Sequence, residues 1–200
     1  VAGGLGIHAQ WSDDFHPALH AVLTGEGQGY YGDFAHAGLG GLARTLTGAY
    51  FHDGAWSGFR RRHHGRPVDT ALLPGWKFFG YLQDHDQIGN RAVGDRISAS
   101  LSPGLLAVGA TLVLTSPFTP MLFMGEEWGA ATPWQFFTSH TDPEIGRATA
   151  EGRKGEFAEH GWDADEVPDP QDPETFTRSK LDWSEPEREP HRALLAVHRS

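Results

Sequence analysis

Residues 81–96, YLQDHDQIGNRAVGDR, place acids, amides, a histidine and two arginines directly behind an apolar run, KFFGYLQ at residues 77–83. The apolar run follows the turn-forming pair Pro74-Gly75, which predicts a strand that begins after the turn. A segment this polar at the end of a strand is either an ordinary strand-to-helix loop or the floor of an active site. The other predicted strands bear on this choice.

Short apolar runs alternate with longer helix-like segments along most of the chain. We predict strands at residues 5–11, 77–83 and 120–125, and helices at residues 13–25, 39–51, 91–101, 104–116 and from about 187 to the end. Asp13 or Asp14 is the expected N-cap of the first helix, Gly25 is its expected end, and Ser102-Pro103 separates the third helix from the fourth. Strands joined by helical connections are typical of a parallel sheet, and strands without polar alternation suit a sheet buried on both faces.

Each of the three predicted strands ends in a cluster of polar side chains. The clusters are Gln10, Trp11, Asp13 and Asp14; Asp84, His85, Asp86, Gln87 and Asn90; and Glu126, Glu127 and Trp128. In barrels of parallel strands, the C-terminal strand ends meet on one face and build the active site. A helix cap accounts for Asp13 or Asp14, but a cap uses one carboxylate and leaves His85 and Gln87 unexplained. The pattern therefore favours an active site around residues 84–90.

Residues 81–96 resemble the region around the third catalytic carboxylate in the α-amylase superfamily of glycoside hydrolases. The motif DQIGNRAxGDR is similar to the maltooligosyltrehalose trehalohydrolase family in particular, and so are the blocks at residues 9–34, 117–140 and 152–185. The resemblance implies an α/β fold, a parallel (β/α)8 TIM barrel of which this chain holds only the later strands and helices. Residues 1–200 are then one partial catalytic barrel domain, including an acidic, proline-rich loop at residues 160–190 and a closing helix.

The resemblance also implies roles for individual residues. Asp86 matches the catalytic carboxylate that grips sugar hydroxyls and stabilises the positively charged transition state, and His85 matches the histidine that hydrogen-bonds the same sugar. The further substrate-binding positions that it implies are Gln87, Asn90, Arg91, Trp11, Asp13, Asp14 and Tyr31. The implied reaction is the release of trehalose from maltooligosyltrehalose by cleavage of the α-1,4-glucosidic bond next to the terminal trehalose unit, with a retaining mechanism. The alternatives are a branching or debranching relative and a non-catalytic fragment that at most binds α-glucan.

Two features of the sequence qualify this picture. Asp84 stands where the family usually has Asn, and repulsion between neighbouring carboxylates is expected to raise one pKa beside His85 and Asp86. Retaining glycosidases need a nucleophile and an acid/base about 5–5.5 Å apart, and in this superfamily both lie on earlier strands. We expect neither among these 200 residues, so the isolated chain is expected to be inactive.

The composition argues against several other functions. The formal net charge is -10, with 26 acidic and 16 basic residues, which speaks against general nucleic-acid binding. The chain has no cysteine, so it offers neither disulfides nor thiolate metal sites, and this fits a reducing compartment. No uninterrupted apolar stretch reaches the roughly 18–20 residues of a membrane-spanning helix. We expect a cytoplasmic enzyme that acts on an α-glucan and uses no cofactor and no metal.

Two clusters of basic groups allow more than one reading. Residues 59–67, FRRRHHGRP, are either a phosphate site or a solvated loop between strands, and the loop is favoured. His16 and His20, one helical turn apart, have the spacing of metal ligands but lack a third strong ligand at a fixed spacing. A helix face is therefore favoured for them over a metal site.

The residues after the third predicted strand are also open to two readings. Glu126 and Glu127 are expected to have a structural or supporting role rather than to act as an acid/base. Three aromatic side chains are expected either to stack on glucose rings or to pack inside the barrel. They are Trp128, Trp134 and Phe136.

Overall fold

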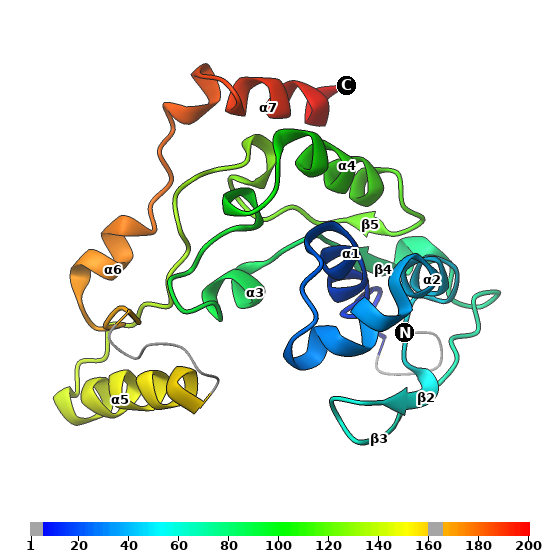
Figure 1. Ribbon diagram of the computed structural model, residues 1–200, viewed down its shortest axis with the longest axis horizontal. Coiled ribbons are helices and arrows are strands. Elements are labelled where there is room, and N and C mark those ends of the chain that lie inside the picture. The colour runs from blue at the N-terminus through cyan, green and yellow to red at the C-terminus, as the bar shows by residue number, and fades with distance from the viewer. Residues whose placement is uncertain (1–5, 160–165) are drawn as a thin grey trace. The chain divides into compact units, whose positions relative to one another are not determined.

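The computed structural model describes residues 6–159 and 166–200, and the chain divides into two compact units. Unit 1 comprises Val1–Leu82 and Leu101–Leu122, and unit 2 comprises Gln83–Ser100 and Phe123–Ser200. The elements of unit 1 are β1 (Gln10–Trp11), α1 (Phe15–Thr24), η1 (Gly29–Tyr31), α2 (Gly32–Gly48), β2 (Asp53–Ser57), β3 (Arg62–Gly65), η2 (Gly75–Lys77), β4 (Phe78–Gly80), α4 (Pro103–Leu114) and β5 (Thr119–Pro120). The elements of unit 2 are α3 (His85–Gly89), η3 (Ile97–Ala99), η4 (Glu126–Trp128), α5 (Pro143–Glu159), α6 (Pro173–Arg178), η5 (Glu185–Glu187) and α7 (His191–Arg199), labelled in Figure 1 where there is room.

Unit 1 is built on a three-stranded sheet in the order β1-β4-β5, with every neighbouring pair parallel. Helices lie between consecutive strands in the chain, so the predicted parallel α/β arrangement is confirmed. The strands are shorter than predicted, because each pair of neighbours is joined in register over only two residues. The third strand was also misplaced: β5 ends at Pro120, and residues 121–125 are not a strand.

Close packing between α1 and the sheet explains the local sequence of unit 1. Phe15 and Leu19 on α1 are 0% exposed. Gly25 ends the helix as predicted, in the left-handed conformation at φ 76°, with its N–H bonded to the Ala21 carbonyl at 2.9 Å. In β4, a Cβ at Gly80 would lie 2.9 Å from the Phe118 ring and 3.1 Å from Phe15, so only glycine fits between these side chains.

The remainder of unit 1 departs from the prediction at one point. α2 packs against α1 and covers most of the predicted second helix, with a break at Gly38 (Figure 1). α4 begins at the predicted Ser102-Pro103 boundary, where Ser102 accepts the Leu105 N–H. The basic stretch at residues 59–67 was read as a loop, but it contains β3, which pairs antiparallel with β2 in a hairpin.

In its described part, unit 2 consists of helices joined by segments without regular secondary structure. The helix predicted at residues 91–101 is wrong: only η3 forms there, because Gly94 takes a left-handed conformation at φ 69° and turns the chain. The predicted loop at residues 160–190 contains α6 and η5 in its described part, and residues 160–165 lie outside the described residues. α5 was not predicted, since its sequence has three glycines and little apolar periodicity.

The last helix of the chain was predicted correctly, although α7 begins at His191 rather than near residue 187. It packs against η4 and η5. A cluster of buried side chains in unit 2 joins Ala92, Phe157 and Val167. Within residues 6–159 and 166–200, no helix has both the length and the apolar character needed to cross a membrane.

Candidate functional site

The segment after β4 forms the first turn of α3 and presents two predicted site residues to solvent. Asp84 has an extended backbone and caps α3. Its Oδ1 accepts hydrogen bonds from the backbone N–H groups of Asp86 at 2.7 Å and Gln87 at 3.2 Å. The Gln87 Oε1 in return accepts the Asp84 N–H at 3.1 Å, which completes a capping box. The side chains of His85 and Asp86 are left 56% and 70% exposed, with Nε2 and Oδ1 3.5 Å apart. The sequence thus holds this pair at the surface by purely local contacts.

The pKa of Asp84 is raised, as the sequence led us to expect for one of the neighbouring carboxyls, but the main cause differs from the one expected. The residue is 3% exposed, and burial is the largest cause that raises the pKa of its carboxyl. Hydrogen bonds from the backbone of Gln87 and Asp86 lower this pKa, and the charge of Asp86 makes only a smaller upward contribution. The expected repulsion between neighbouring carboxylates is therefore secondary to desolvation.

Gln87, Asn90 and Arg91, also predicted to bind substrate, are held by contacts within unit 2. Gln87 is used by the capping box, and the Arg91 Nε donates to the Asp95 carboxylate at 2.7 Å. The exposed Asn90 accepts a long hydrogen bond of 3.4 Å from Arg153, which also donates to the backbone of α3. Arg153 was missed by sequence reasoning because it lies on α5, which was not predicted.

In unit 1, the turn after β1 exposes an indole ring beside a carboxylate. Trp11 is 37% exposed, and Asp13 is exposed as well. The Tyr81 hydroxyl donates to Asp13 Oδ1 at 3.1 Å, and its ring meets Trp11 edge-on with centroids 5.5 Å apart. Such a patch suits a ligand that has both an apolar face and hydroxyl groups.

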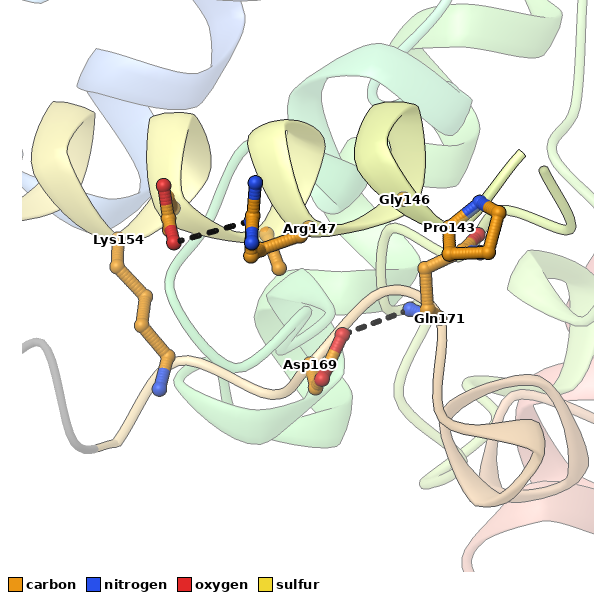
Figure 2. A pocket seen from close by; sticks show the side chains of 8 residues that line it. Pro143, Gly146, Arg147, Lys154, Asp169 and Gln171 are labelled. Carbon is orange, nitrogen blue, oxygen red and sulfur yellow. Dashed lines mark hydrogen bonds and ion pairs between the residues drawn. The ribbon is translucent and has the colours of Figure 1, made fainter.

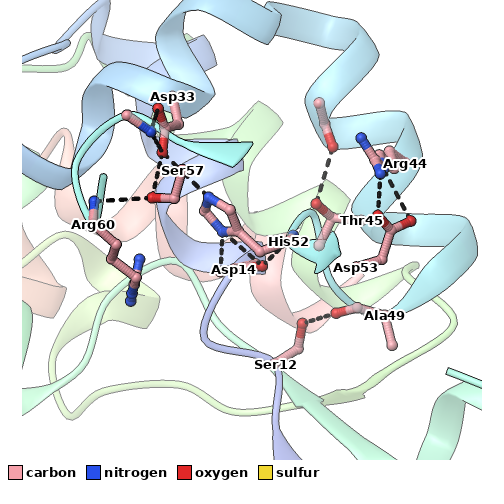
Figure 3. A network of polar contacts seen from close by, with 12 residues as sticks. Ser12, Asp14, Asp33, Arg44, Thr45, Ala49, His52, Asp53, Ser57 and Arg60 are labelled. Atoms are coloured by element: carbon pink, nitrogen blue, oxygen red, sulfur yellow. Dashed lines mark hydrogen bonds and ion pairs between the residues drawn. The ribbon is translucent and has the colours of Figure 1, made fainter. Parts of the chain in front are cut away.

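Asp14 is held by a buried polar network rather than by the helix that follows it. It occupies the N-cap position of α1, as predicted for Asp13 or Asp14, but its side chain forms no hydrogen bond to the first turn of the helix. Its Oδ2 accepts the backbone N–H of His52 at 2.8 Å, and both of its oxygens lie 3.3 Å from His52 Nδ1 (Figure 3). The other nitrogen of the ring lies 3.2 Å from the carboxylate of Asp33. No sequence pattern pointed to His52 or Asp33, because both are distant from Asp14 in the chain.

Tyr31 belongs to a buried cluster of rings in unit 1. Its hydroxyl lies 2.8 Å from His16 Nε2, and its ring stacks on His20 with centroids 4.6 Å apart. Burial, with a smaller contribution from the charge of His20, lowers the pKa of His16 to about 3. The neutral His16 ring therefore donates through Nδ1 to the Leu82 carbonyl and accepts from Tyr31. In the part of the chain that the structure describes, no three His, Cys, Asp or Glu side chains form a group suited to a metal ion.

Glu126 is a deeply buried acid in unit 2. It is 6% exposed in η4, where its Oε2 accepts the Phe123 N–H at 3.2 Å. Burial is the main cause that raises the pKa of this carboxyl to about 8, and the charge of Glu127 adds to the effect. The charge of Arg96 and the Gln83 amide act in the opposite direction. A carboxyl in this setting holds its proton at neutral pH, in keeping with the structural role expected for it.

The aromatic side chains around η4 differ in exposure. Trp128 is 3% exposed, and its Nε1 donates to the Glu185 carboxylate at 3.0 Å, so packing explains it. Trp134 is half-buried and meets the Phe123 ring edge-on at 5.3 Å. Phe136 is 41% exposed and lies under the guanidinium of Arg153, 4.5 Å from ring centroid to Cζ.

A cavity of about 300 Å³ lies along α5 in unit 2 (Figure 2). Its lining residues are Pro143, Gly146, Arg147, Ala150, Glu151, Lys154, Asp169 and Gln171. Arg147 pairs with Glu151 at 3.8 Å, and Asp169 accepts the Gln171 N–H at 2.9 Å. None of the predicted site residues lines this cavity.

No family model matches the chain. It is 63% identical over 198 residues to the malto-oligosyltrehalose trehalohydrolase of Arthrobacter ramosus, a match that covers 99% of this chain and 34% of that protein. It is 60% identical over 197 residues to the enzyme of the same name from Brevibacterium helvolum, covering 98% of this chain and 33% of that protein. The chain thus spans about a third of the length of these relatives.

A solved structure supports the fold. The crystal structure of a proposed alpha amylase from Salmonella typhimurium matches with a TM-score of 0.84 and 43% sequence identity, over 96% of this chain and 32% of that chain. The parallel strands and intervening helices of unit 1 fit part of a TIM barrel. The resemblance inferred from the sequence motifs is confirmed along nearly the whole chain.

Proposed function

Almost the whole of this chain is 60% or more identical to about one third of the malto-oligosyltrehalose trehalohydrolases of Arthrobacter ramosus and Brevibacterium helvolum, and from this premise we propose that it is part of a glycoside hydrolase of the α-amylase superfamily. In this proposal the complete protein releases trehalose from maltooligosyltrehalose by hydrolysing the α-1,4-glucosidic bond beside the terminal trehalose unit, with a retaining mechanism. The observation that carries the proposal is the exposed His85–Asp86 pair, which a capping box holds at the start of α3.

Asp86 is assigned the stabilisation of positive charge on the sugar ring. Glycoside hydrolysis passes through an oxocarbenium-like transition state, and a carboxylate held beside the ring gains most interaction as that charge develops. The 70% exposure of the Asp86 side chain leaves it accessible to a ligand, while its backbone N–H is fixed by Asp84. His85, 56% exposed, is proposed to hydrogen-bond the same sugar.

The other predicted substrate contacts fall into two groups by exposure. Trp11, Asp13 and Asn90 are exposed, and we assign them direct contacts with the α-glucan. The remaining four are engaged in contacts within the chain, and we assign them the shaping of the surfaces around the substrate. They are Gln87, Arg91, Asp14 and Tyr31.

The nucleophile and the acid/base are proposed to lie in the part of the relatives that this chain does not span. A retaining reaction needs both groups, about 5–5.5 Å apart, in addition to Asp86. The isolated chain is therefore proposed to be inactive. We also propose a cytoplasmic location for the complete protein, and the proposed chemistry needs no cofactor.

The proposal is tested with a full-length hybrid, in which this chain replaces the matching third of the Arthrobacter ramosus trehalohydrolase. We expect the hybrid to release trehalose from maltooligosyltrehalose, because 63% of the exchanged positions are identical. The measurement is chromatographic analysis of the products, with the unmodified Arthrobacter ramosus protein as the positive control.

The products also separate the competing activities. Glucose and maltose without trehalose would indicate an α-amylase, in line with the description of the Salmonella typhimurium structure. New α-1,6 bonds, or their loss from a branched glucan, would indicate a branching or debranching relative. A hybrid that is folded and yields none of these products would refute a catalytic role for this chain.

A further inference from the structure

The turn that carries Trp11, Asp13 and Asp14 forms three hydrogen bonds with one segment of unit 1 that is distant in the sequence. Residues 49–52 follow α2 and supply all three contacts. The Ala49 carbonyl accepts the Ser12 hydroxyl, the Tyr50 hydroxyl donates to the Trp11 carbonyl at 2.8 Å, and the backbone N–H of His52 donates to Asp14 at 2.8 Å. The contact between Ser12 and Ala49 and that between Asp14 and His52 can be followed in Figure 3.

The conformation of this segment is an unusual one. Ala49 adopts a left-handed backbone at φ 68°, although it has a Cβ. Such a residue is strained and persists only where its surroundings fix it. Here the left-handed residue ends α2, and its carbonyl is the one that Ser12 reaches.

His52 connects this segment to a second anchor. The residue is 3% exposed, and its two ring nitrogens face the carboxylates of Asp14 and Asp33. Asp33 also accepts the Ser57 hydroxyl at 2.8 Å and the Gly58 N–H at 2.8 Å. These contacts link the turn after β1, the start of α2 and the end of β2.

The charge state of Asp33 suits its role as an acceptor in this set of contacts. Burial raises its pKa, but the hydrogen bonds from Ser57 and Gly58, together with His52, outweigh burial and leave the pKa below its usual range. The carboxylate therefore stays ionised and remains an acceptor for the His52 ring at neutral pH.

We propose that His52 is a positioning residue, which acts through Asp14 to fix the Trp11–Asp13 patch in the conformation that binds the α-glucan. The inference rests on the proposed function, because it takes Trp11 and Asp13 to be substrate contacts. It assigns Asp14 to holding the turn, since both of its carboxylate oxygens face His52. Loss of the ring then weakens substrate binding, while the chemistry at Asp86 is left intact.

The test uses the full-length hybrid with His52→Gln, which removes one of the two ring contacts and keeps the backbone N–H that reaches Asp14. We expect KM for maltooligosyltrehalose to rise about tenfold, the equivalent of one buried hydrogen bond, with kcat changed by no more than about twofold. Tyr50→Phe, a milder change that removes only the hydroxyl on the Trp11 carbonyl, is expected to raise KM in the same direction. Arg44→Gln is the matched control, because Arg44 pairs with Asp53 at the surface of the same region.

A second readout separates positioning from a loss of folding. In a hybrid that already carries Trp11→Ala, the added His52→Gln change is expected to raise KM by much less than tenfold, since the group that it positions is absent. Binding of maltopentaose, measured by calorimetry in the Asp86→Asn background, is expected to weaken in parallel with KM.

The possible outcomes distinguish failure of the positioning role from failure of the proposed function. An active hybrid in which His52→Gln and Tyr50→Phe leave KM unchanged overturns the positioning role and leaves the proposed function standing. An equal effect of His52→Gln with and without Trp11 also overturns it. A folded hybrid that releases no trehalose but binds maltopentaose more weakly after His52→Gln refutes the proposed function and supports the positioning role. A hybrid that neither reacts nor binds refutes both.

Discussion

The two polar segments that follow β1 and β4 are supported in different ways. Asp84 caps α3 through atoms two and three residues away in the chain. The turn after β1 depends instead on partners 37, 38 and 39 residues away, at Ala49, His52 and Tyr50. A segment with local support can form its conformation as soon as its own helix forms, whereas the turn after β1 exists only once α2 and the segment behind it are in place. Substitutions in the two segments should therefore have different consequences.

The largest expected effect concerns the locally supported segment. Asp86→Asn in the full-length hybrid is expected to lower kcat by about 100-fold or more, because one preorganised electrostatic group at the transition state is lost. The stability should change by less than about 0.5 kcal/mol, since the side chain is 70% exposed. The measurements are kcat and the melting temperature, with Glu187→Gln, an exposed acid of unit 2, as the control. An unchanged kcat would remove Asp86 from the active site.

The same contrast explains what could be predicted from the sequence. The polar cluster at residues 84–90 could be singled out because its residues are contiguous. The C-terminal end of α1 and the start of α4 were correct because Gly25 and Ser102 act on adjacent backbone. His52 and Asp33 were missed, because their importance comes from contacts that span 38 and 19 residues. No local pattern records such contacts.

The errors in the elements have related causes. The helix expected at residues 91–101 contains Gly94, whose left-handed conformation brings its backbone against that of Trp134. Asp84 was expected to be shifted by repulsion from its neighbour, but the degree of burial decides its pKa, and burial depends on the fold. The proposed roles of the site residues stay predictions until the hybrid is assayed.

The second prediction concerns the pH dependence of stability that the buried Glu126 of unit 2 causes. Glu126 has its pKa raised to about 8, so between about pH 4.5 and pH 8 the folded state binds a proton that the unfolded state has released. The free energy of unfolding should therefore fall as the pH rises through this window, by up to a few kcal/mol at 1.36 kcal/mol per pKa unit. Above pH 8 the loss should be complete.

Glu126→Gln removes the titrating group and keeps the shape of the side chain. Melting temperatures of the hybrid and of this variant at pH 5, 7 and 9 should diverge as the pH rises, with the variant becoming the more stable of the two. Glu187→Gln serves again as the control, because its side chain is exposed. Parallel pH curves for the hybrid and Glu126→Gln would show that Glu126 does not hold its proton.

A smaller effect is expected at the turn after β1. Ser12 is 0% exposed, and Ser12→Ala leaves the carbonyl of the left-handed Ala49 without its hydroxyl donor. The expected destabilisation is about 1–3 kcal/mol, the cost of a buried acceptor that has lost its partner. Thermal unfolding of the hybrid measures this destabilisation. The comparison variant is Ser98→Ala, which removes a hydroxyl donor to the Ala130 carbonyl in unit 2. A loss in Ser12→Ala no larger than a few tenths of a kcal/mol would mean that water replaces the contact.

The smallest effect is expected at the cap of α3, and it completes the contrast. Asp84→Ala removes the acceptor of the two N–H groups and should cost about 1 kcal/mol, as for other helix caps. Asp84→Asn keeps an acceptor oxygen and avoids the ionised group that burial disfavours, so at pH 7 it should be at least as stable as the parent hybrid. As the pH falls and Asp84 takes up a proton, the free energy of unfolding of the parent hybrid should rise relative to that of Asp84→Asn. The reason is that the pKa of this carboxyl is higher in the folded than in the unfolded state. If Asp84→Ala destabilised the hybrid more than Ser12→Ala, the local cap would be the stronger of the two supports, and the segment after β4 would depend on the fold as much as the turn after β1 does.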